Sequence, residues 1–352
     1  MQIRIVQSVL RDARWHPLLD VIVYIVTEAE SRLTFEATNI RSLLSSPWLA
    51  AASGSRGSLP DLVQASLRAF SRGVPSDAVT IVLDDTAPMS GETSAKNLIR
   101  IHPLGCISLI SRPFNLIVED EVTDGGFVLW MARLLGRDEV IRAYVAGRLV
   151  FRHAGGKGQI VKSASTLSEG IWPRPGRIIL AMQLRSAVLL DSDAKYPGDA
   201  PNEAICTKAV PWVGFVHLLA GRTIENYIPI KYFRDRLQAD NLGYKADIYF
   251  SMTEAQRAHF PLKKGFFNGD QPSRPQTHAE FCADSRRTVE ERNHFQPINP
   301  TTWAELADGF GERFASVFTS STYRCNPRDH RGLTTDQRAE ISNLMVKLLK
   351  FL

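Results

Sequence analysis

The sequence predicts an α/β protein in which a parallel sheet carries helices on both faces, preceded by an N-terminal α/β domain and followed by helical additions. Between residues 113 and 230, apolar strand runs alternate with helical stretches, which is typical of a parallel sheet buried on both faces. Residues 1–112 mix strand and helix patterns, and residues 231–352 are mainly helical. These ranges are the three predicted domains.

Composition excludes several classes of protein. The 352 residues include 42 Lys+Arg and 37 Asp+Glu, with 44% hydrophobic residues, so the chain is expected to fold and to be long enough for two domains. No run approaches the ~20 apolar residues of a membrane span, and residues 1–5 lack an apolar signal core. We therefore expect a cytoplasmic protein without a membrane partner.

The N-terminal domain begins with a period-2 pattern that predicts a strand over residues 1–7. An apolar stretch covers residues 18–26, and a Ser/Gly-rich break covers residues 52–58. A helix is predicted over residues 60–70, because Ser58 can cap it and Pro60 lies in its first turn. A buried strand follows over residues 78–83, and nothing in this domain indicates a chemistry.

The middle domain contains four predicted strands with polar segments after them. The strand predictions cover residues 115–120, 148–152, 185–193 and 212–219. An apolar helix is predicted over residues 127–135, and a glycine-rich turn over residues 153–158 precedes a polar helix. Because parallel strands present functional groups at their carboxyl ends, we expect the polar segments to meet there.

Helical patterns dominate the last domain. The predicted helices cover residues 230–237, 253–259, 276–292, 302–318 and 335–351. A Pro- and Asn-rich link over residues 296–300 separates two of them. The last helix is amphipathic, which indicates packing against the core, with binding to a partner as the lesser alternative.

Acidic residues follow separate strands of the middle domain. Glu119 ends the first strand, Asp191 and Asp193 follow the third, and Glu225 lies in an Arg-Thr-Ile-Glu-Asn-Tyr segment. Carboxylates that converge repel one another unless a hard cation lies between them. Oxygen ligands without His or Cys in ligand spacing favour Mg²⁺ or Mn²⁺ over zinc.

This arrangement resembles the TOPRIM domain shared by topoisomerases, bacterial primases and the OLD-family nucleases. The resemblance covers residues 114–229 and rests on Glu119, Asp191 and Asp193. Asp124, the Gly-Gly-Lys turn that ends at Lys157, and Glu225 stand where the nuclease branch has further elements. The resemblance implies a TOPRIM-like domain over residues 113–230.

The resemblance implies a Mg²⁺-dependent (or Mn²⁺-dependent) nuclease that hydrolyses phosphodiester bonds with two metal ions. Glu119, Asp191 and Asp193 are assigned to one ion, and Asp124 with Glu225 to the other. Lys157 is expected to contact the scissile phosphate as a point charge. Ten Lys/Arg and three acids between residues 133 and 185 are expected to follow the nucleic-acid backbone, so that binding weakens with salt.

One departure from the family pattern leaves the first ligand open. The usual spacing is Glu-Gly-x-x-Asp, whereas here Asp120 replaces the glycine and Asp124 lies five residues after Glu119. Either the loop carries an insertion or Glu121 is the ligand. Glu119 is the preferred assignment.

Partners follow from what the chain lacks. It contains no Gly-x-x-x-x-Gly-Lys-[Ser/Thr] motif, so an ATPase or other sensor is expected as a separate subunit, as the resemblance implies for anti-phage defence nucleases. The expected substrate is nucleic acid, with DNA favoured over RNA, and a homo-oligomer is compatible with the sequence. The rival functions are topoisomerase or primase strand transfer, with Tyr227 as the nucleophile, and a non-catalytic interaction subunit.

Three further features of the sequence give weaker predictions. The four cysteines are dispersed, which excludes a C-x-x-C zinc pair and favours inert thiols. The segment 260–266 places two lysines beside aromatic residues, so it is either a plain loop or a nucleic-acid contact by charge and stacking. His153 is interpreted as a surface or supporting residue rather than a proton shuttle.

Overall fold

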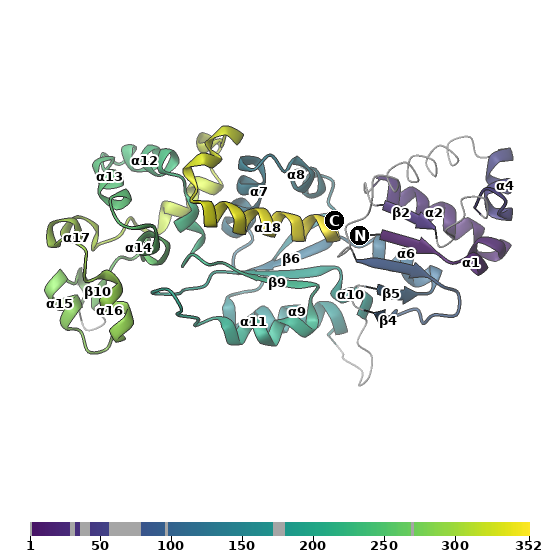
Figure 1. Ribbon diagram of the computed structural model, residues 1–352, viewed down its shortest axis with the longest axis horizontal. Coiled ribbons are helices and arrows are strands. Elements are labelled where there is room, and N and C mark those ends of the chain that lie inside the picture. Colours follow the sequence, from purple (N-terminus) through teal and green to yellow (C-terminus); the bar gives the residue numbers. More distant parts are fainter. Residues whose placement is uncertain are drawn as a thin grey trace.

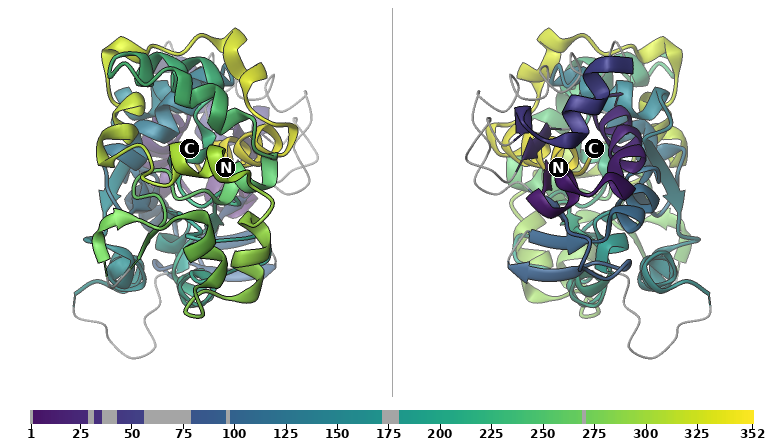
Figure 2. Two further views of the ribbon diagram at one scale, coloured as in Figure 1. Left: turned by 90° about the vertical axis from the view of Figure 1, so that its left-hand side faces the viewer. Right: turned by 90° about the vertical axis from the view of Figure 1, so that its right-hand side faces the viewer.

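A computed structural model describes residues 2–28, 32–35, 43–55, 79–95, 98–171, 180–268 and 271–352. The molecule is elongated, with an N-terminal sheet at one end, a second sheet in the middle and small helices at the other end (Figure 1). The two end views place the N-terminal elements and helices α15 and α16 at opposite ends (Figure 2). The chain is therefore a mixed α/β protein with parallel sheets, as predicted.

The N-terminal sheet has the strand order β2-β1-β3-β5-β4, and only β4 runs antiparallel to its neighbour. Its strands are β1 (Gln2–Ile5), β2 (Arg32–Phe35), β3 (Thr80–Leu83), β4 (Glu92–Ala95) and β5 (Leu98–Ile101). Its helices are α1 (Gln7–Arg11), η1 (Ala13–Trp15), α2 (His16–Glu28), α4 (Pro47–Ser55) and α6 (Pro103–Ile110). Alternate side chains of β1 and β3 pack with α2 and α6 in a separate core.

The N-terminal predictions had different outcomes. The strands predicted at residues 1–7 and 78–83 are confirmed as β1 and β3, and the apolar stretch is the helix α2. The break predicted over residues 52–58 is wrong for residues 52–55, because α4 continues to Ser55, and residues 56–58 lie outside the described residues. The helix predicted over residues 60–70 lies outside the described residues.

The second sheet contains four parallel strands in the order β7-β6-β8-β9. The strands are β6 (Phe114–Val118), β7 (Leu149–His153), β8 (Ser186–Leu190) and β9 (Phe215–Leu218), which confirms the four predicted strands. Register places Val118 beside His153 and Ile117 beside Val188. The residues that follow β6, β7 and β8 therefore begin at neighbouring points of one sheet edge.

Helices cover both faces of this sheet. They are α7 (Thr123–Leu134), α8 (Asp138–Val145), η2 (Lys157–Gln159), α9 (Ile160–Glu169), α10 (Leu180–Gln183), α11 (Glu203–Ala209), η3 (Val210–Trp212) and η4 (Ile224–Tyr227). Leu116 of β6 packs in the core that includes α7, while its neighbour Ile117 packs with α9 and α11 on the opposite face. This alternation explains why the strands are apolar along their whole length.

The C-terminal region is mainly helical and shares its core with the second sheet. Its elements are α12 (Ile230–Gln238), α13 (Tyr244–Phe250), α14 (Glu254–His259), β10 (Phe267–Asn268), β11 (Gln271–Pro275), α15 (His278–Ala283), α16 (Val289–Phe295), α17 (Pro300–Leu306), η5 (Glu312–Phe318), η6 (Ser321–Tyr323), η7 (Pro327–Gly332) and α18 (Thr335–Phe351). The helix α18 runs along the second sheet, and Phe351 stacks on Phe114 of β6 at 5.6 Å (Figure 1). Core packing by the last helix is thus confirmed.

Two helix predictions in this region are wrong. The predicted helix over residues 276–292 is two helices, because the Asp284 side chain accepts from the backbone of Arg286 and Thr288 caps a new helix. The predicted helix over residues 302–318 ends at Leu306, since Gly309 and Gly311 adopt positive φ before η5 begins. The hairpin β10–β11 was not predicted.

Candidate active site

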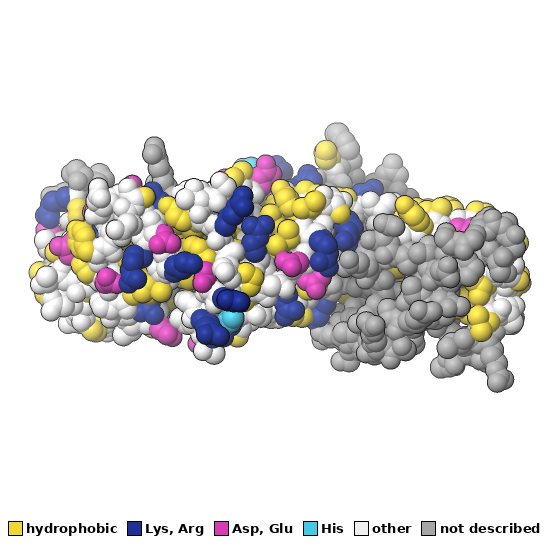
Figure 3. Space-filling view, turned by 90° about the horizontal axis from the view of Figure 1, so that it is seen from above, with side chains coloured by type: hydrophobic (Ala, Val, Ile, Leu, Met, Phe, Trp, Pro, Cys, Tyr) yellow, Lys and Arg dark blue, Asp and Glu magenta, His cyan; other side chains and the backbone are white. Residues whose placement is uncertain are grey.

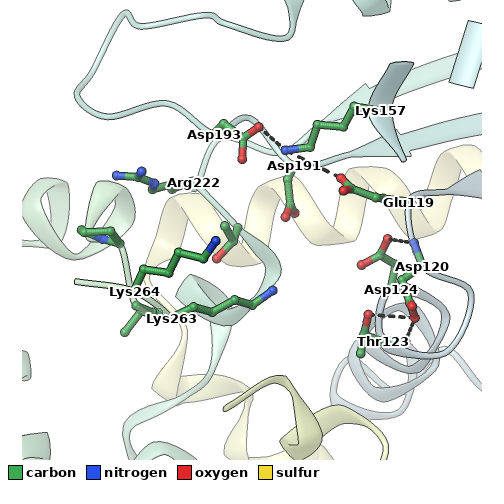
Figure 4. A pocket seen from close by; sticks show the side chains of 13 residues that line it. Glu119, Asp120, Thr123, Asp124, Lys157, Asp191, Asp193, Arg222, Lys263 and Lys264 are labelled. Atoms are coloured by element: carbon green, nitrogen blue, oxygen red, sulfur yellow. Dashed lines mark hydrogen bonds and ion pairs between the residues drawn. The ribbon is translucent and has the colours of Figure 1, made fainter. Parts of the chain in front are cut away.

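The carboxyl ends of the second sheet open into a pocket of about 370 Å³. Segments after β6, β7 and β8 form one side, and the segment after β9 together with a loop after α14 forms the other (Figure 4). The pocket is lined by Glu119, Asp120, Thr123, Asp124, Lys157, Asp191, Asp193, Arg222, Thr223, Pro261, Leu262, Lys263 and Lys264. The structure thus brings together Glu119, Asp124, Lys157, Asp191 and Asp193, which are separated in the sequence.

The loop after β6 explains the unusual spacing of its acids. Asp120 holds the loop that leads into α7, because its Oδ1 accepts from the backbone N–H groups of Val122 (2.9 Å) and Thr123 (2.7 Å), the first residue of the helix. The bond from Thr123 is the main reason that the pKa of Asp120 is lowered. Asp124 Oδ2 accepts from the Asp120 backbone at 2.9 Å, so Asp124 turns back toward the pocket. Glu119 lines the pocket, whereas Glu121 is exposed and does not.

Lys157 reaches the acids from a glycine turn after β7. Gly155 and Gly156 have φ values of 81° and 97°, which a residue with a side chain rarely adopts. The turn directs the Lys157 ammonium group to Asp193, with which it forms an ion pair, and to within 3.7 Å of Glu119 Oε2. Lys157 therefore lies between two of the predicted ligands (Figure 4).

The Asp-Ser-Asp segment after β8 is attached to the segment that follows β9. Ser192 Oγ donates to the Gly221 carbonyl at 2.8 Å, and the Asp193 N–H donates to the Arg222 carbonyl at 2.9 Å. Asp191 Oδ1 accepts from the Ile224 N–H at 3.1 Å. Asp193 has φ of 55°, a conformation that aspartate tolerates better than most residues. These bonds position both carboxylates relative to η4.

Glu225 lies in η4 with no exposed surface. A capping box between Thr223 and Asn226 holds this short helix. Lys263 Nζ is 3.0 Å from Glu225 Oε1, yet within the described chain neither carboxylate oxygen accepts a hydrogen bond of ordinary geometry. Glu225 is therefore a buried side chain beside the pocket, and its two carboxyl oxygens could accept further hydrogen bonds or contact a cation.

Burial and mutual repulsion perturb the acids electrostatically. The pKa of Asp124 is raised to about 6, mainly by burial and to a smaller extent by the charges of Glu119 and Asp120. Burial raises the pKa of Asp191 well above its ordinary range, and repulsion from Asp124 and Glu225 adds to this. Lys157 and Lys263 oppose the shift at Asp191. More positive charge at this point would stabilise the ionised carboxylates.

The donor set fits a hard divalent cation in its chemistry. The acids supply only oxygen ligands. Two ammonium groups already pair with these acids, Lys157 with Glu119 and Asp193 and Lys263 with Glu225. Within the described residues, no three His, Cys, Asp or Glu side chains are arranged as a ready ligand set. Binding an ion would therefore require side-chain movement from these ion pairs.

Sequence reasoning missed the basic side of the pocket. Arg222, Lys263 and Lys264 line it opposite the acids, and the two lysines extend toward Asp191 (Figure 4). Their signal was the Lys-Lys pair in the segment 260–266, which the sequence left open between a plain loop and a nucleic-acid contact. The alternative that nucleic-acid bases stack on the aromatic residues of this segment is wrong, because Phe260 and Phe266 are 1% and 2% exposed and pack in the core.

Other expected contributors lie elsewhere. Tyr227 is 1% exposed, and its hydroxyl donates to Glu340 and accepts from the Gly221 N–H, so it does not line the pocket. His153 is exposed at the end of β7, outside the pocket lining. The four cysteines are free thiols, and burial raises the pKa of Cys106 to about 12.

The predicted basic track is only partly compatible with the structure. Arg185 is 5% exposed and donates to the carbonyls of Phe351 and Arg112, so it supports the fold and cannot follow a nucleic acid. Arg174 and Arg177 lie outside the described residues. On the face seen from above, the described Lys and Arg side chains are interspersed with acidic and apolar ones, and among the described residues they form no continuous stripe (Figure 3).

Comparisons with protein-family models, curated proteins and solved structures found no match for this chain. In the described part of the chain, no helix has both the length and the apolar character needed to span a membrane.

Proposed function

We propose that this protein is a Mg²⁺-dependent nuclease that hydrolyses phosphodiester bonds at the pocket beside β6, β7 and β8. The observation that carries the proposal is the convergence of separate acidic segments with four cationic side chains in one pocket. Acidic side chains alone would repel a phosphate group. Basic side chains alone would bind a phosphate group but would not hold a divalent cation. Their combination suits a polyanionic substrate bound with divalent cations.

The resemblance assigns the acids to two metal ions. Glu119, Asp191 and Asp193 would hold one Mg²⁺ or Mn²⁺ ion, and Asp124 with Glu225 would hold a second. When bound, two such ions neutralise the non-bridging oxygens, lower the pKa of a water nucleophile and stabilise the leaving oxygen. The raised pKa of Asp191 and the incompletely hydrogen-bonded Glu225 support this assignment, because further positive charge would stabilise both carboxylates even with Lys263 3.0 Å from Glu225.

The basic side chains would bind and orient the substrate. Lys157 is a point charge on a glycine turn, and it can bind a non-bridging phosphate oxygen. Lys263 and Lys264 approach from the opposite wall, so a nucleic-acid strand would pass between this loop and the sheet edge (Figure 4). Arg222, at the same wall, offers a planar fork of donors to a neighbouring phosphate.

The order of the elements supports the TOPRIM resemblance as part of this proposal. Glu119 follows β6, Lys157 follows β7, the Asp191/Asp193 segment follows β8, and Glu225 follows β9. The resemblance extends the proposal to an effector of anti-phage defence that acts on DNA in the cytoplasm with a separate ATPase or sensor subunit.

The test is cleavage by the whole chain, alone and with its partner, of plasmid, linear DNA and tRNA in Mg²⁺. Glu119→Ala and Asp191→Ala/Asp193→Ala are expected to abolish cleavage. Glu121→Ala is the matched control, because it removes an exposed acid from the same loop and should leave the rate unchanged. Equal cleavage by wild type and both site variants would remove the proposal.

The same preparations separate the rival functions. Strand transfer through Tyr227 predicts a covalent adduct with DNA that disappears in Tyr227→Phe, and the bonded, buried hydroxyl argues against it. A non-catalytic interaction subunit predicts no heat of Mg²⁺ or Mn²⁺ binding in calorimetry. The nuclease proposal predicts metal binding without an adduct.

A further inference from the structure

The C-terminal helix α18 contacts the segment that carries Glu225 from behind the pocket. Glu340 of α18 uses both carboxylate oxygens: Oε1 accepts from the Ala220 N–H at 2.8 Å, and Oε2 accepts from the Tyr227 hydroxyl at 2.6 Å. Gln337, one turn earlier, donates to the Asn226 carbonyl at 2.9 Å. One face of α18 therefore holds both ends of the segment 220–227.

Tyr227 relays this contact inside the segment. Its hydroxyl accepts from the Gly221 N–H at 2.8 Å while it donates to Glu340. Gly221 lacks a side chain, and a Cβ there would lie 2.9 Å from the Tyr227 ring, so the tyrosine packs directly on the backbone. Glu340 thus fixes the Ala220 and Gly221 backbone, one N–H directly and the other through Tyr227.

The opposite side of the same segment bonds to the acids of the pocket. The Gly221 and Arg222 carbonyls accept from Ser192 Oγ and the Asp193 N–H, and the Ile224 N–H donates to Asp191. Glu225 follows immediately. A displacement of the segment 220–227 would consequently move Asp191, Asp193 and Glu225 together, although Glu340 does not line the pocket.

A second cavity, of about 730 Å³, lies on the α18 side of this segment. It is lined in part by His217, Gly221, Tyr227, Asp336 and Glu340. The His217 Nε2 atom is 3.5 Å from Glu340 Oε1, and the histidine is 5% exposed. The segment 220–227 is therefore a wall between two cavities, and side-chain contacts from α18 hold it in place.

We propose that Glu340 is a positioning residue for the metal site, acting through Ala220, Tyr227 and the segment 220–227 on Asp191 and Glu225. The inference rests on the proposed nuclease function for its metal readout, whereas the attachment of the segment can be measured separately. Residues that orient metal ligands from behind typically change metal affinity by about 10- to 100-fold when replaced.

The experiment compares the full-length wild type with Glu340→Gln, Tyr227→Phe and their double variant. Glutamine offers one acceptor oxygen for two donors, so one of the two Glu340 bonds is lost with little change of volume. Asp336→Asn is the matched control, because it makes the same change of charge one turn earlier on α18 and lines the same cavity. Thermal midpoints show that each variant is folded.

Three readouts decide the inference. Calorimetry with Mn²⁺ should show affinity weakened about 10- to 100-fold in Glu340→Gln, with a double variant no weaker than the worse single variant, because both changes break one path. The Mg²⁺ concentration for half-maximal cleavage should rise similarly, while the rate at saturating Mg²⁺ changes much less. Hydrogen exchange of the amides of residues 220–227 should be several-fold faster than in wild type and in Asp336→Asn.

The possible failures are distinguishable. If Glu340→Gln matches Asp336→Asn in exchange and in Mn²⁺ affinity, the positioning role is overturned. If exchange quickens but the Mn²⁺ affinity of a metal-binding wild type is unchanged, the segment is attached by Glu340 without governing the site, and the inference is likewise overturned. If wild type binds no metal, the proposed function fails, and the positioning of a metal site fails with it.

Discussion

The ion pair between Lys263 and Glu225 leads to a prediction that needs no knowledge of the substrate. Glu225 is fully buried, Lys263 Nζ lies 3.0 Å from it, and the Lys263 side chain is 34% exposed. Lys263→Gln removes the positive charge of the ammonium group and leaves the Glu225 carboxylate buried without this charged partner. Breaking a buried pair costs about 3–5 kcal/mol, and solvent screening at the partly exposed lysine reduces this, so we expect a loss of about 2 kcal/mol.

Thermal unfolding in a chelator measures this loss. With an unfolding entropy of about 2.1 cal/mol/K per residue, a chain of 352 residues that unfolds as a unit loses about 3 °C in Tm for 2 kcal/mol. Lys264→Gln is the matched control, because it removes the same charge from the exposed neighbouring lysine. We expect it to lower Tm by less than 1 °C, as is usual for an exposed substitution.

Addition of Mg²⁺ then tests the role of the carboxylates. A ligand that binds only the folded state raises its stability, and an ion near Glu225 replaces the charge that Lys263→Gln removed. Mg²⁺ should therefore raise the Tm of Lys263→Gln by more than it raises that of wild type. The reasoning is refuted if Lys263→Gln and Lys264→Gln are equally stable in chelator, or if Mg²⁺ stabilises wild type and Lys263→Gln to the same extent.

Three further predictions follow from single contacts. Asp120→Ala should cost about 1 kcal/mol in urea unfolding, because it removes the acceptor of two N–H groups at the start of α7, and Glu121→Ala should cost almost nothing; equal costs would contradict a stabilising role of these bonds. Lys157→Gln should slow cleavage about 100-fold while calorimetry shows tighter Mg²⁺ binding, because the ammonium no longer competes for its carboxylates; weaker binding would contradict this. Burial is the main cause that lowers the pKa of His259 and His294, so their neutral forms stabilise the fold at a pH above about 6.5. This stability is lost as pH falls through their folded pKa values, and His294→Gln should reduce the drop in unfolding free energy between pH 7.5 and 5.5; an unchanged drop would show that His294 does not contribute.

The strands and several helices could be predicted from sequence because their signals are local. Period-2 and continuous apolar patterns indicate strands, and the parallel order makes acids at strand ends neighbours along one edge. Glu119, Lys157 and Asp191 thus reach one pocket through sheet register alone. The hydrogen bond to the Asp284 side chain and the positive φ of Gly309 each interrupt a helical pattern. Periodicity over a longer window passed over both interruptions and therefore predicted helices that are too long.

The sequence by itself determined which side chains follow the strands of the central sheet and therefore the acidic half of the candidate site. Only the tertiary structure decided what faces those acids. Lys263 and Glu225 are 38 residues apart, and Glu340 and Tyr227 are 113 apart. Such contacts depend on how helices without a repeating pattern pack on one core, which no local propensity encodes. The partners of a buried charge are selected by that packing, because an unpaired charge inside the protein would be unstable.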